Sequence, residues 1–437
     1  MATSRGGGRA TLVLGAGISG LAAARRLLQA GHRPLVLEAG PAAGGLTRSI
    51  EIGDFVFDYT GHLLHLARHA APSELPLADL RDAEWQRIER RSLCLVEGRL
   101  VPAPLQYHLG ALPEALRDAC LESFERRPAA RHAAARTFRD FVVEGFGERL
   151  ADLFLIPQNE KTLATSLERL SASAVSRFFP PPDTERVRAG ARGEPQNTGE
   201  YNAQFWYPKR GGIEALVRGL AAPLEEIRLR SRVVHVDLEE RTLHTGDGAS
   251  YGWDLAFSSL PLRELCRLSA HHEIAAGADV LSHSATLVFN IGIRGPLAPA
   301  LRDAHWVYVP DPALPFYRVG VYSNISRGLC PPGCAALYAE VAAPGDAPLR
   351  LAQLQPRVIE ALAQLGWVDP SAILCVSSNA IPCAYVHQTP EAEQFAPWAK
   401  QVLRSHGVIP IGRYGLWGYT SMEDSIHSAI DAVEKAL

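Results

Sequence analysis

The sequence predicts an α/β fold that combines a parallel sheet covered by helices, a second and mostly antiparallel sheet, and an inserted helical subdomain. Three observations predict this fold. A short apolar strand near the N-terminus is followed directly by a glycine-rich turn and an amphipathic helix. Helical periodicity dominates residues 105–180, and apolar runs of strand length recur across residues 263–375. Because residues 407–437 again read as strand, turn and helix, we expect the two ends of the chain to share one sheet.

The N-terminal turn has the spacing of a dinucleotide-binding unit. Gly15, Gly17 and Gly20 follow the strand Leu12–Leu14 in a G-x-G-x-x-G pattern. The first glycine permits the tight turn, the second lets the backbone approach a pyrophosphate, and the third lets helix and strand pack closely. We expect the diphosphate at the N-terminus of the helix that begins near Ile18, where free N–H groups and the helix dipole favour negative charge.

A second strand, Leu35–Leu37, ends in an acidic residue. Glu38 lies 18 residues after Gly20, where a carboxylate can accept hydrogen bonds from ribose hydroxyls. The unit is therefore interpreted as a Rossmann-like domain with a bound dinucleotide. Beside the glycines and the acid, its expected contacts are Ile18, Ser19 and Ala39.

A further glycine pair, Gly44 and Gly45, follows the acid. The pair serves either turn geometry alone or another approach of the backbone to the same diphosphate. Strand, glycines, acid and this pair together resemble the N-terminus of the FAD-binding flavoproteins of the amine oxidase, protoporphyrinogen oxidase and UDP-galactopyranose mutase group. The resemblance implies FAD as cofactor, a GR2-type FAD-binding domain, and contacts to the cofactor from Gly45 and Leu46.

Composition limits the classes of function. The 437 residues are 47% hydrophobic and 21% charged, with a net charge of −3, so no basic excess indicates nucleic-acid binding. No apolar run has the length of a membrane span, and we expect a cytoplasmic protein. Seven scattered cysteines form no disulfide framework. Cys330 and Cys334 lie close together but lack the other ligands of a zinc site, so we interpret them as unpaired thiols and expect no metal.

Residues 1–80 are expected to form the first part of the FAD-binding domain. Within them, Asp58-Tyr59-Thr60-Gly61-His62 resembles a segment of galactopyranose mutases that places a histidine near the flavin ring. The resemblance implies that His62 contacts the flavin. The alternative is a histidine satisfied at the end of a strand.

Residues 81–104 read as strands of the substrate domain with a hairpin at Glu97-Gly98-Arg99, and residues 105–180 as the helical subdomain. The end of that subdomain resembles the mutase pattern P-Y-x-E-K-x-W through Pro157, Glu160 and Lys161. Gln158 and Leu163 replace the tyrosine and the tryptophan that stacks on uracil in the family. The stretch 171–177 resembles the segment whose arginine meets the substrate diphosphate, which implies that role for Arg177; a surface arginine is the alternative.

Residues 180–204 read as a polar loop that could act as a lid, and residues 205–262 as the second part of the FAD-binding domain. Tyr207-Pro208 and Gly211-Gly212 resemble the family segment that leads back into this domain. A strand around Val233 follows, and in the family the backbone of this strand holds the adenine. Residues 243–253 read as a β-hairpin.

Residues 263–375 read as the antiparallel sheet of the substrate domain, and residues 376–437 as the C-terminal part of the FAD-binding domain. Phe316-Tyr317-Arg318-Val319 resembles the strand that supplies a second diphosphate arginine, and Ala384-Tyr385-Val386 a turn with a substrate-side tyrosine. The run from Gly412 to Tyr419 resembles the mutase pattern G-R-x-G-x-x-x-Y. This resemblance implies contacts to the flavin from Gly412, Arg413, Tyr419 and Met422.

The resemblance implies that the reduced flavin N5 attacks the anomeric carbon of a nucleotide-activated sugar and expels its diphosphate, and that the ring recloses as a furanose. His62, Arg177, Arg318, Tyr385 and Tyr419 are the residues that it implies for this chemistry. The expected partner is a small molecule, a nucleotide sugar, and a homodimer remains open.

The second hypothesis is an FAD-dependent oxidase or dehydrogenase of the amine oxidase or protoporphyrinogen oxidase type, which the residues Gln158 and Leu163 favour. A flavin-binding scaffold without turnover is the third.

Overall fold

Two sheets organise the chain, of which the computed structural model describes residues 11–77, 80, 83–127, 135–172, 182–196 and 203–437. The first is a five-stranded parallel sheet in the order β19-β13-β1-β2-β9. Its strands come from both ends and the middle of the chain, as expected from the sequence. They are β1 (Thr11–Leu14), β2 (Leu35–Leu37), β9 (Ile227–Arg228), β13 (Leu255–Ser258) and β19 (Val408–Pro410).

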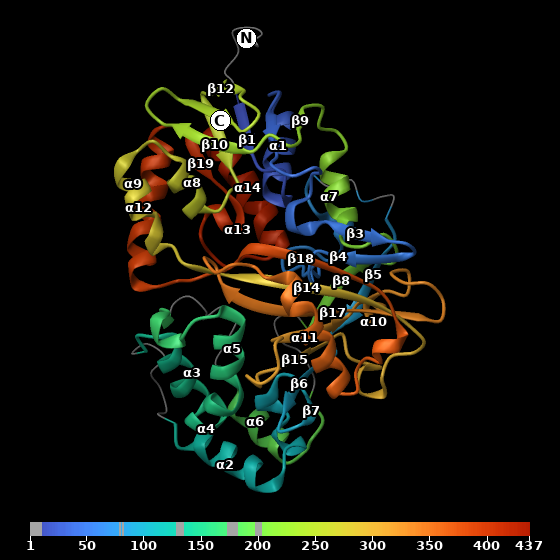
Figure 1. Cartoon of the computed structure of the whole chain (residues 1–437). Coiled ribbons are helices and arrows are strands. Elements are labelled where there is room, and N and C mark those ends of the chain that lie inside the picture. The colour runs from blue at the N-terminus through green and yellow to red at the C-terminus, as the bar shows by residue number, and fades with distance from the viewer. Residues whose placement is uncertain (1–10, 78–79, 81–82, 128–134, 173–181, 197–202) are drawn as a thin grey trace.

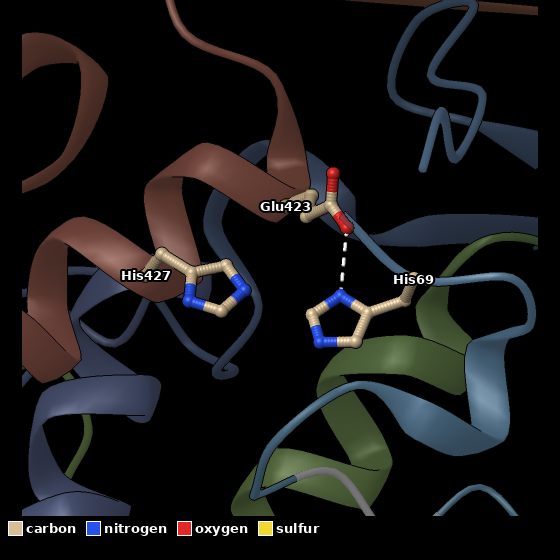
Figure 2. Close-up of side chains that lie close together, drawn as sticks. All are labelled: His69, Glu423 and His427. Carbon is tan, nitrogen blue, oxygen red and sulfur yellow. Dashed lines mark hydrogen bonds and ion pairs between the residues drawn. The ribbon is translucent and has the colours of Figure 1, made fainter. Parts of the chain in front are cut away.

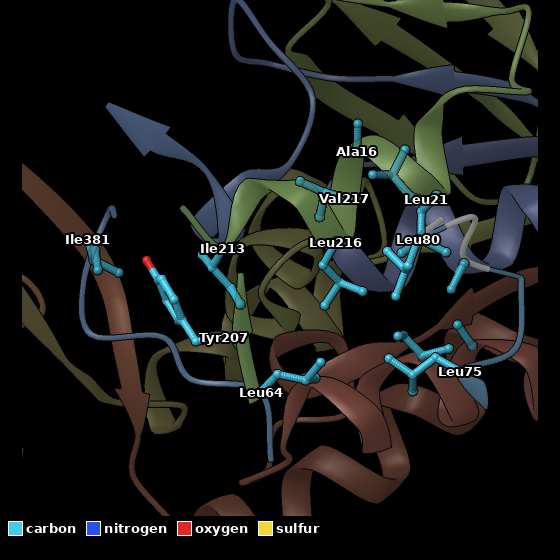
Figure 3. Packing of buried hydrophobic residues seen from close by; sticks show 14 of the residues in the cluster. Ala16, Leu21, Leu64, Leu75, Leu80, Tyr207, Ile213, Leu216, Val217 and Ile381 are labelled. Atoms are coloured by element: carbon cyan, nitrogen blue, oxygen red, sulfur yellow. The ribbon is translucent and has the colours of Figure 1, made fainter. Parts of the chain in front are cut away.

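Helices α1 (Ile18–Gln29), α7 (Glu214–Ala221) and α14 (Met422–Ala436) pack beside this sheet. The buried face of α1 is rich in alanine, which lets the helix approach its neighbours closely. Leu21 from α1 meets Leu216 and Val217 from α7 in the buried cluster of Figure 3. At the start of α14, Glu423 accepts a hydrogen bond from His69, which lies in the segment after β4 (Figure 2).

The second sheet has seven strands in the order β18-β14-β17-β16-β15-β6-β7 and lies in the middle of the molecule (Figure 1). All neighbouring pairs are antiparallel except β15 and β6, which are parallel. Helix α11 (Leu351–Gln364) packs on it over a core of its own. Its strands are β6 (Ser92–Val96), β7 (Arg99–Pro102), β14 (His283–Arg294), β15 (Trp306–Tyr308), β16 (Arg318–Val321), β17 (Cys334–Pro344) and β18 (Ile373–Val386).

A helical subdomain lies at the end opposite the parallel sheet (Figure 1). Its core combines leucines with phenylalanines, including Phe124, Phe138 and Phe146. A π-helical turn at Ala151–Leu155 joins two of its helices. The helices are α2 (Glu114–Glu125), α3 (Phe138–Phe146), α4 (Glu148–Leu150), α5 (Ile156–Leu163) and α6 (Thr184–Ala191).

Smaller elements complete the fold. Antiparallel ribbons join β3 (Ser49–Ile52) to β4 (Phe55–Asp58) and β5 (Trp85–Glu89) to β8 (Gln204–Pro208). A three-stranded sheet holds β10 (Val233–Asp237), β11 (Thr242–Thr245) and β12 (Ser250–Gly252). The remaining helices are α8 (Leu262–Leu268), α9 (His272–Gly277), α10 (Tyr322–Ile325), α12 (Pro390–Ser405) and α13 (Gly412–Gly415). None of the helices in the described residues is both long enough and apolar enough to cross a membrane.

Three expectations from the sequence need correction. The boundary at residue 376 falls inside β18, so residues 376–386 belong to the seven-stranded sheet rather than to the FAD-binding part. The stretch 180–204 contains α6, whose Val187 and Ala191 pack in the core of the helical subdomain. Strand β5 pairs with β8 and stays outside the sheet that β6 and β7 join.

Candidate active site

A cavity of about 890 Å³ is lined by elements of both main sheets. Its wall combines residues of the N-terminal turn, such as Gly15 and Gly17, with residues of the seven-stranded sheet, such as Arg318 and Tyr385. Ligand pockets typically measure about 300–1,000 Å³, so this one suits a large ligand. Its lining residues come from both parts of the chain, the one that the sequence predicts to bind the cofactor and the one that it predicts to bind the substrate.

The glycine turn leaves backbone exposed to the cavity. Gly15 has a φ of +90°, and a Cβ there would lie 2.5 Å from Ser259 Oγ. Gly17 and Gly45 approach so closely that a Cβ on Gly45 would lie 3.0 Å from Gly17 Cα. Gly17 is also the N-cap of α1, and neither a side-chain cap nor an acidic residue occupies that helix end. The first-turn N–H groups of α1 are thus available to an anion such as a diphosphate.

Glu38 is held at the end of β2 by backbone amides. Its Oε2 accepts from Ala16 N at 2.7 Å and its Oε1 from Gly40 N at 2.7 Å. Its carbonyl oxygen accepts from Ser231 N at 2.8 Å, which brings the start of β10 to the same wall. Glu38, Ser231 and Val233 all line the cavity. Each carboxylate oxygen has a second acceptor position, so hydroxyls of a ligand can still bind.

An ion pair stands in the wall formed by the seven-stranded sheet. Arg318 on β16 lies opposite Glu340 on β17, and its Nε and Nη2 donate to the two carboxylate oxygens at 2.6 and 2.8 Å. Thr60 Oγ1 also donates to Glu340. The guanidinium holds the pKa of the buried Glu340 below its usual range, although burial acts in the opposite direction. Both groups therefore stay charged, and the carboxylate neutralises Arg318.

His62 and Arg413 line the same cavity. Burial, with help from the Arg413 charge, lowers the pKa of His62 to about 4, so its ring is neutral at pH 7. Arg413 lies beside the rings of Tyr385 and Tyr419, with its Cζ 5.6 and 5.3 Å from their centroids. Its Nη1 donates to Thr420 O at 3.1 Å, whereas its buried Nε has no hydrogen-bond partner within the described part of the chain. Such a donor is costly to bury, and an acceptor on a ligand could satisfy it.

Asp58 fixes the backbone that leads to this histidine. The buried carboxylate accepts from Ser49 Oγ at 2.7 Å, Tyr207 OH at 2.5 Å and Ile213 N at 3.1 Å, which ties β4 to β8 and to the turn before α7. Burial raises the pKa of Asp58 to about 6. Thr60 and His62 follow directly, so this anchor sets their position in the wall.

The comparisons with known proteins agree with this geometry. The family of flavin-containing amine oxidoreductases matches residues 18–437. The chain belongs to this family. It therefore belongs to a superfamily of flavin-dependent oxidoreductases, and a flavin is the cofactor that membership implies.

Solved structures of several flavoproteins are similar to the whole chain. A reduced UDP-galactopyranose mutase superimposes with a TM-score of 0.90 at 26% identity, covering 98% of this chain and 94% of its own. A putative protoporphyrinogen oxidase from Exiguobacterium sp. 255-15 gives a TM-score of 0.76 at 17% identity, covering 100% and 99%. A double mutant of putrescine oxidase gives 0.66 at 15% identity, covering 98% of each chain. At identities of 17% and 15%, the last two structures show only that the fold is shared.

The cavity of this family member contains most of the residues predicted to hold the cofactor. Three features fit a flavin dinucleotide. The backbones of Gly17 and Gly45 lie close together without side chains, the N-terminus of α1 has no side-chain cap, and Arg413 Nε has no hydrogen-bond partner among the described residues. The predicted residues that line the cavity are Gly15, Gly17, Ile18, Ser19, Glu38, Ala39, Gly45, Leu46, His62, Val233, Arg413 and Met422.

Three predicted contacts do not line the cavity. A Cβ on Gly20 would lie 1.9 Å from Gly15 O, so this glycine serves the packing of α1 against the turn. A Cβ on Gly412, where φ is +69°, would lie 2.1 Å from Ser19 Oγ. Tyr419 donates its hydroxyl to Val386 O, and the neighbouring Tyr414 lines the cavity in its place.

The predicted substrate residues divide similarly. Arg318 and Tyr385 line the cavity, and Arg177 lies outside the described residues. Gln158 and Leu163 are buried away from the cavity; Gln158 donates to Tyr317 O at 3.1 Å. Lys161 binds the carbonyls of Val309 and Asp311, so this match to the family motif has a structural role.

Sequence reasoning missed several residues of the wall. Glu340, which lies behind the wall as the partner of Arg318, was not singled out, although a charged residue within the apolar run Ala335–Val341 is a signal for a buried pair. Aromatic residues from β15, from β17 and from the position just before β16 also went unnoticed as a group. They are Trp306, Tyr308, Tyr317 and Tyr338.

Proposed function

We propose that the protein binds FAD in this cavity and, with the flavin reduced, interconverts the pyranose and furanose forms of a nucleotide-activated sugar. One observation carries the proposal: the likeness to a reduced UDP-galactopyranose mutase extends over 98% of the chain with a TM-score of 0.90. The likeness therefore includes the seven-stranded sheet and the helical subdomain as well as the parallel sheet.

The turn at Gly15 and Gly17 and the start of α1 would hold the diphosphate of FAD, Glu38 the ribose, and the backbone at Val233 the adenine. Arg413 would donate its unpaired Nε to the flavin ring. A bound reduced flavin supplies an electron-rich ring nitrogen that can displace a leaving group at a sugar carbon. A side-chain nucleophile is then unnecessary, in agreement with Cys383, a cysteine of the cavity wall whose pKa is raised to about 12 by burial.

The chain's own task is to position a sugar and its anionic leaving group. Arg318 is fixed by two hydrogen bonds to Glu340 and can present its remaining N–H groups to phosphate oxygens. Tyr385 lines the same wall, and neutral His62 can exchange hydrogen bonds with sugar hydroxyls. Arg177 would complete the diphosphate site, as its sequence context implies. For Tyr419 we propose a supporting role, since it holds the end of β18 through Val386.

An oxidase or dehydrogenase is the second candidate. Glu340 neutralises Arg318, and the aromatic residues Trp306, Tyr308 and Tyr338 line the same cavity. A neutral, aromatic wall suits an organic amine or a cyclic substrate better than a diphosphate. The Arg318–Glu340 pair and the aromatic residues of the cavity therefore favour an oxidase or dehydrogenase.

The two candidates separate in one anaerobic experiment. Dithionite-reduced protein is incubated with UDP-galactopyranose, and the nucleotide sugars are resolved by chromatography. The mutase proposal expects a furanose product from reduced protein and none from oxidised protein. If oxidised flavin instead bleaches on addition of an amine and no furanose forms, the oxidase is correct.

Tyr385→Phe tests the wall, with Arg294→Ala as control. Arg294 is an exposed arginine at the end of β14 and does not line the cavity. We expect the Tyr385 variant to retain flavin and lose at least about tenfold in kcat/KM, equivalent to about 1.4 kcal/mol of transition-state stabilisation. The control should match the unmodified protein. Equal activity in both variants would remove Tyr385 from the site.

A further inference from the structure

Two histidines and a glutamate meet outside the cavity, between the segment after β4 and helix α14 (Figure 2). Glu423 and His427 are four residues apart on α14, so they share one face of the helix. His69 approaches that face from the preceding segment. One ligand atom from each residue lies within 4.8 Å of the others.

The glutamate is the fixed member of this cluster. Its carboxylate is 1% exposed, and Oε2 accepts from Ala67 N at 2.6 Å. Its Oε1 accepts from Arg68 N at 3.1 Å and from His69 Nδ1 at 2.7 Å. These bonds fix the position of the carboxylate, and the hydrogen bond from Nδ1 holds the His69 ring beside it.

The second histidine has an unused buried atom. His427 Nε2 is inaccessible to solvent and has no hydrogen-bond partner among the described residues. Figure 2 shows this ring facing His69, and the two rings are nearly parallel, with centroids 5.2 Å apart and an interplanar angle of 9°. His69 is 20% exposed, which gives an ion access from solvent.

The charges around the cluster are mixed. Arg68 and His69 oppose positive charge on His427, and the carboxylates of Glu423 and Asp431 favour it to a smaller degree. Arg68 is itself paired with Asp424 at 3.7 Å. Three acidic groups and one arginine therefore surround the two imidazoles.

We propose that His69, Glu423 and His427 form a site for one divalent transition-metal ion of the zinc class. Imidazole nitrogens and a carboxylate oxygen suit such an ion, and tetrahedral bonds of about 2.0 Å place ligand atoms about 3.3 Å apart. Metal binding requires both imidazoles to rotate about their side-chain bonds, and bonds to the ion then replace the hydrogen bond between His69 and Glu423. The ion ties the segment after β4 to α14, whose Met422 and Ser425 line the cavity. Its role is structural and independent of the reaction catalysed.

The test uses the flavin-loaded protein after treatment with EDTA and removal of the chelator. Zn²⁺ binding is measured by titration calorimetry, and Co²⁺ serves as a spectroscopic probe of ligand type. We expect one Zn²⁺ per chain, a visible Co²⁺ spectrum of nitrogen and oxygen ligands, and a higher thermal midpoint with Zn²⁺. His427→Gln and, separately, His69→Gln should each weaken binding by about 100-fold, since removal of a ligand costs at least as much as removal of a supporting group.

His235→Gln is the matched control. His235 and His244 form another close histidine pair, with ring centroids 5.8 Å apart, on β10 and β11. This variant should bind Zn²⁺ as the unmodified protein does. Absence of stoichiometric binding, a sulfur-to-cobalt charge-transfer band, or undiminished affinity in both His69 and His427 variants would each overturn the proposal. Circular dichroism and flavin content establish that the variants are folded.

Discussion

Arg318 and Glu340 determine the charge that one wall of the cavity presents. The arginine side chain is 19% exposed and the glutamate 0%, so the pair forms in a medium of low polarity. Removing one partner of a buried pair leaves the other charge uncompensated, whereas replacing both can be nearly neutral. The pair therefore links the stability of the seven-stranded sheet to the charge that the cavity offers a ligand.

We expect Arg318→Met to lower the free energy of unfolding by about 3–5 kcal/mol, because Glu340 is then buried without a partner. The double variant Arg318→Met, Glu340→Gln should recover most of that loss while it removes the cation. Urea unfolding of the single variants and the double variant gives the coupling energy. Additive losses would show that the ion pair does not account for the instability.

A second residue-scale prediction concerns Gly20. Alanine there places Cβ against Gly15 O, a backbone atom that cannot move aside. We expect Gly20→Ala to reduce flavin content and to cost about 1–3 kcal/mol, as overpacking does. Gly418→Ala is the control, since its Cβ would have no neighbour within 4 Å. Absorbance of bound flavin per chain is the measurement, and normal occupancy in the Gly20 variant would contradict the packing role.

At the scale of elements, the end of β18 is attached to the helical subdomain. His387 follows directly after this strand. It lies 2.9 Å through Nε2 from Leu163 O and 3.1 Å through Nδ1 from Ser282 Oγ. Leu163 ends α5, so a neutral imidazole joins the end of this strand to the subdomain. Burial lowers the pKa of His387 from 6.5 to about 4.

This histidine predicts a pH dependence. Because its pKa in the folded protein lies below that in the unfolded chain, its stabilising effect is complete above pH 6.5. The effect is lost as the pH falls from 6.5 to 4 and is at most about 3 kcal/mol. We expect His387→Gln to flatten the fall in urea midpoint across that window. The exposed His272→Gln should leave the profile unchanged, and equal slopes in both variants would contradict the assignment.

Elements with strong local signals were predicted correctly, and the others were missed for physical reasons. The unit β1, α1 and β2 follows from its glycines and apolar periodicity. Strand β18 has weak alternation because Ser377, Ser378 and Asn379 fill its middle, and its pairing with β14 determines its structure. Helix α6 is polar and short, and contacts with distant residues stabilise it.

The same limit applies to the site. The glycine turn and Glu38 form a local unit, so residue spacing alone was enough to predict that they lie together in one site. The pairing of Arg318 with Glu340 depends on the register of β16 and β17. Tyr419 does not line the cavity because its hydroxyl donates to Val386 O, and this contact depends on where β18 ends. Neither the register nor that strand end is encoded by residue spacing.

At the scale of the whole molecule, the cavity joins residues from Gly15 to Ser425. A ligand that fills it stabilises the folded chain by RT ln(1 + [L]/Kd), about 2.7 kcal/mol at 100 times Kd. We expect FAD to raise the thermal midpoint of cofactor-depleted protein, and FMN to do so less, because FMN lacks the adenylate that would reach Val233. Differential scanning fluorimetry at matched concentrations measures both. Equal increases in thermal midpoint with FAD and FMN would show that the adenylate does not bind at Val233.

The order of strands has a consequence for how this protein can change over time. The chain enters the parallel sheet with β1 and β2, leaves for β6 and β7, returns for β9 and β13, leaves again for β14 to β18, and finishes with β19. Neither sheet can be cut out as a continuous stretch of gene. An exchange of residues 283–386 would carry five of the seven strands but leave β6 and β7 behind, so a transferred wall has to fit the strands that stay.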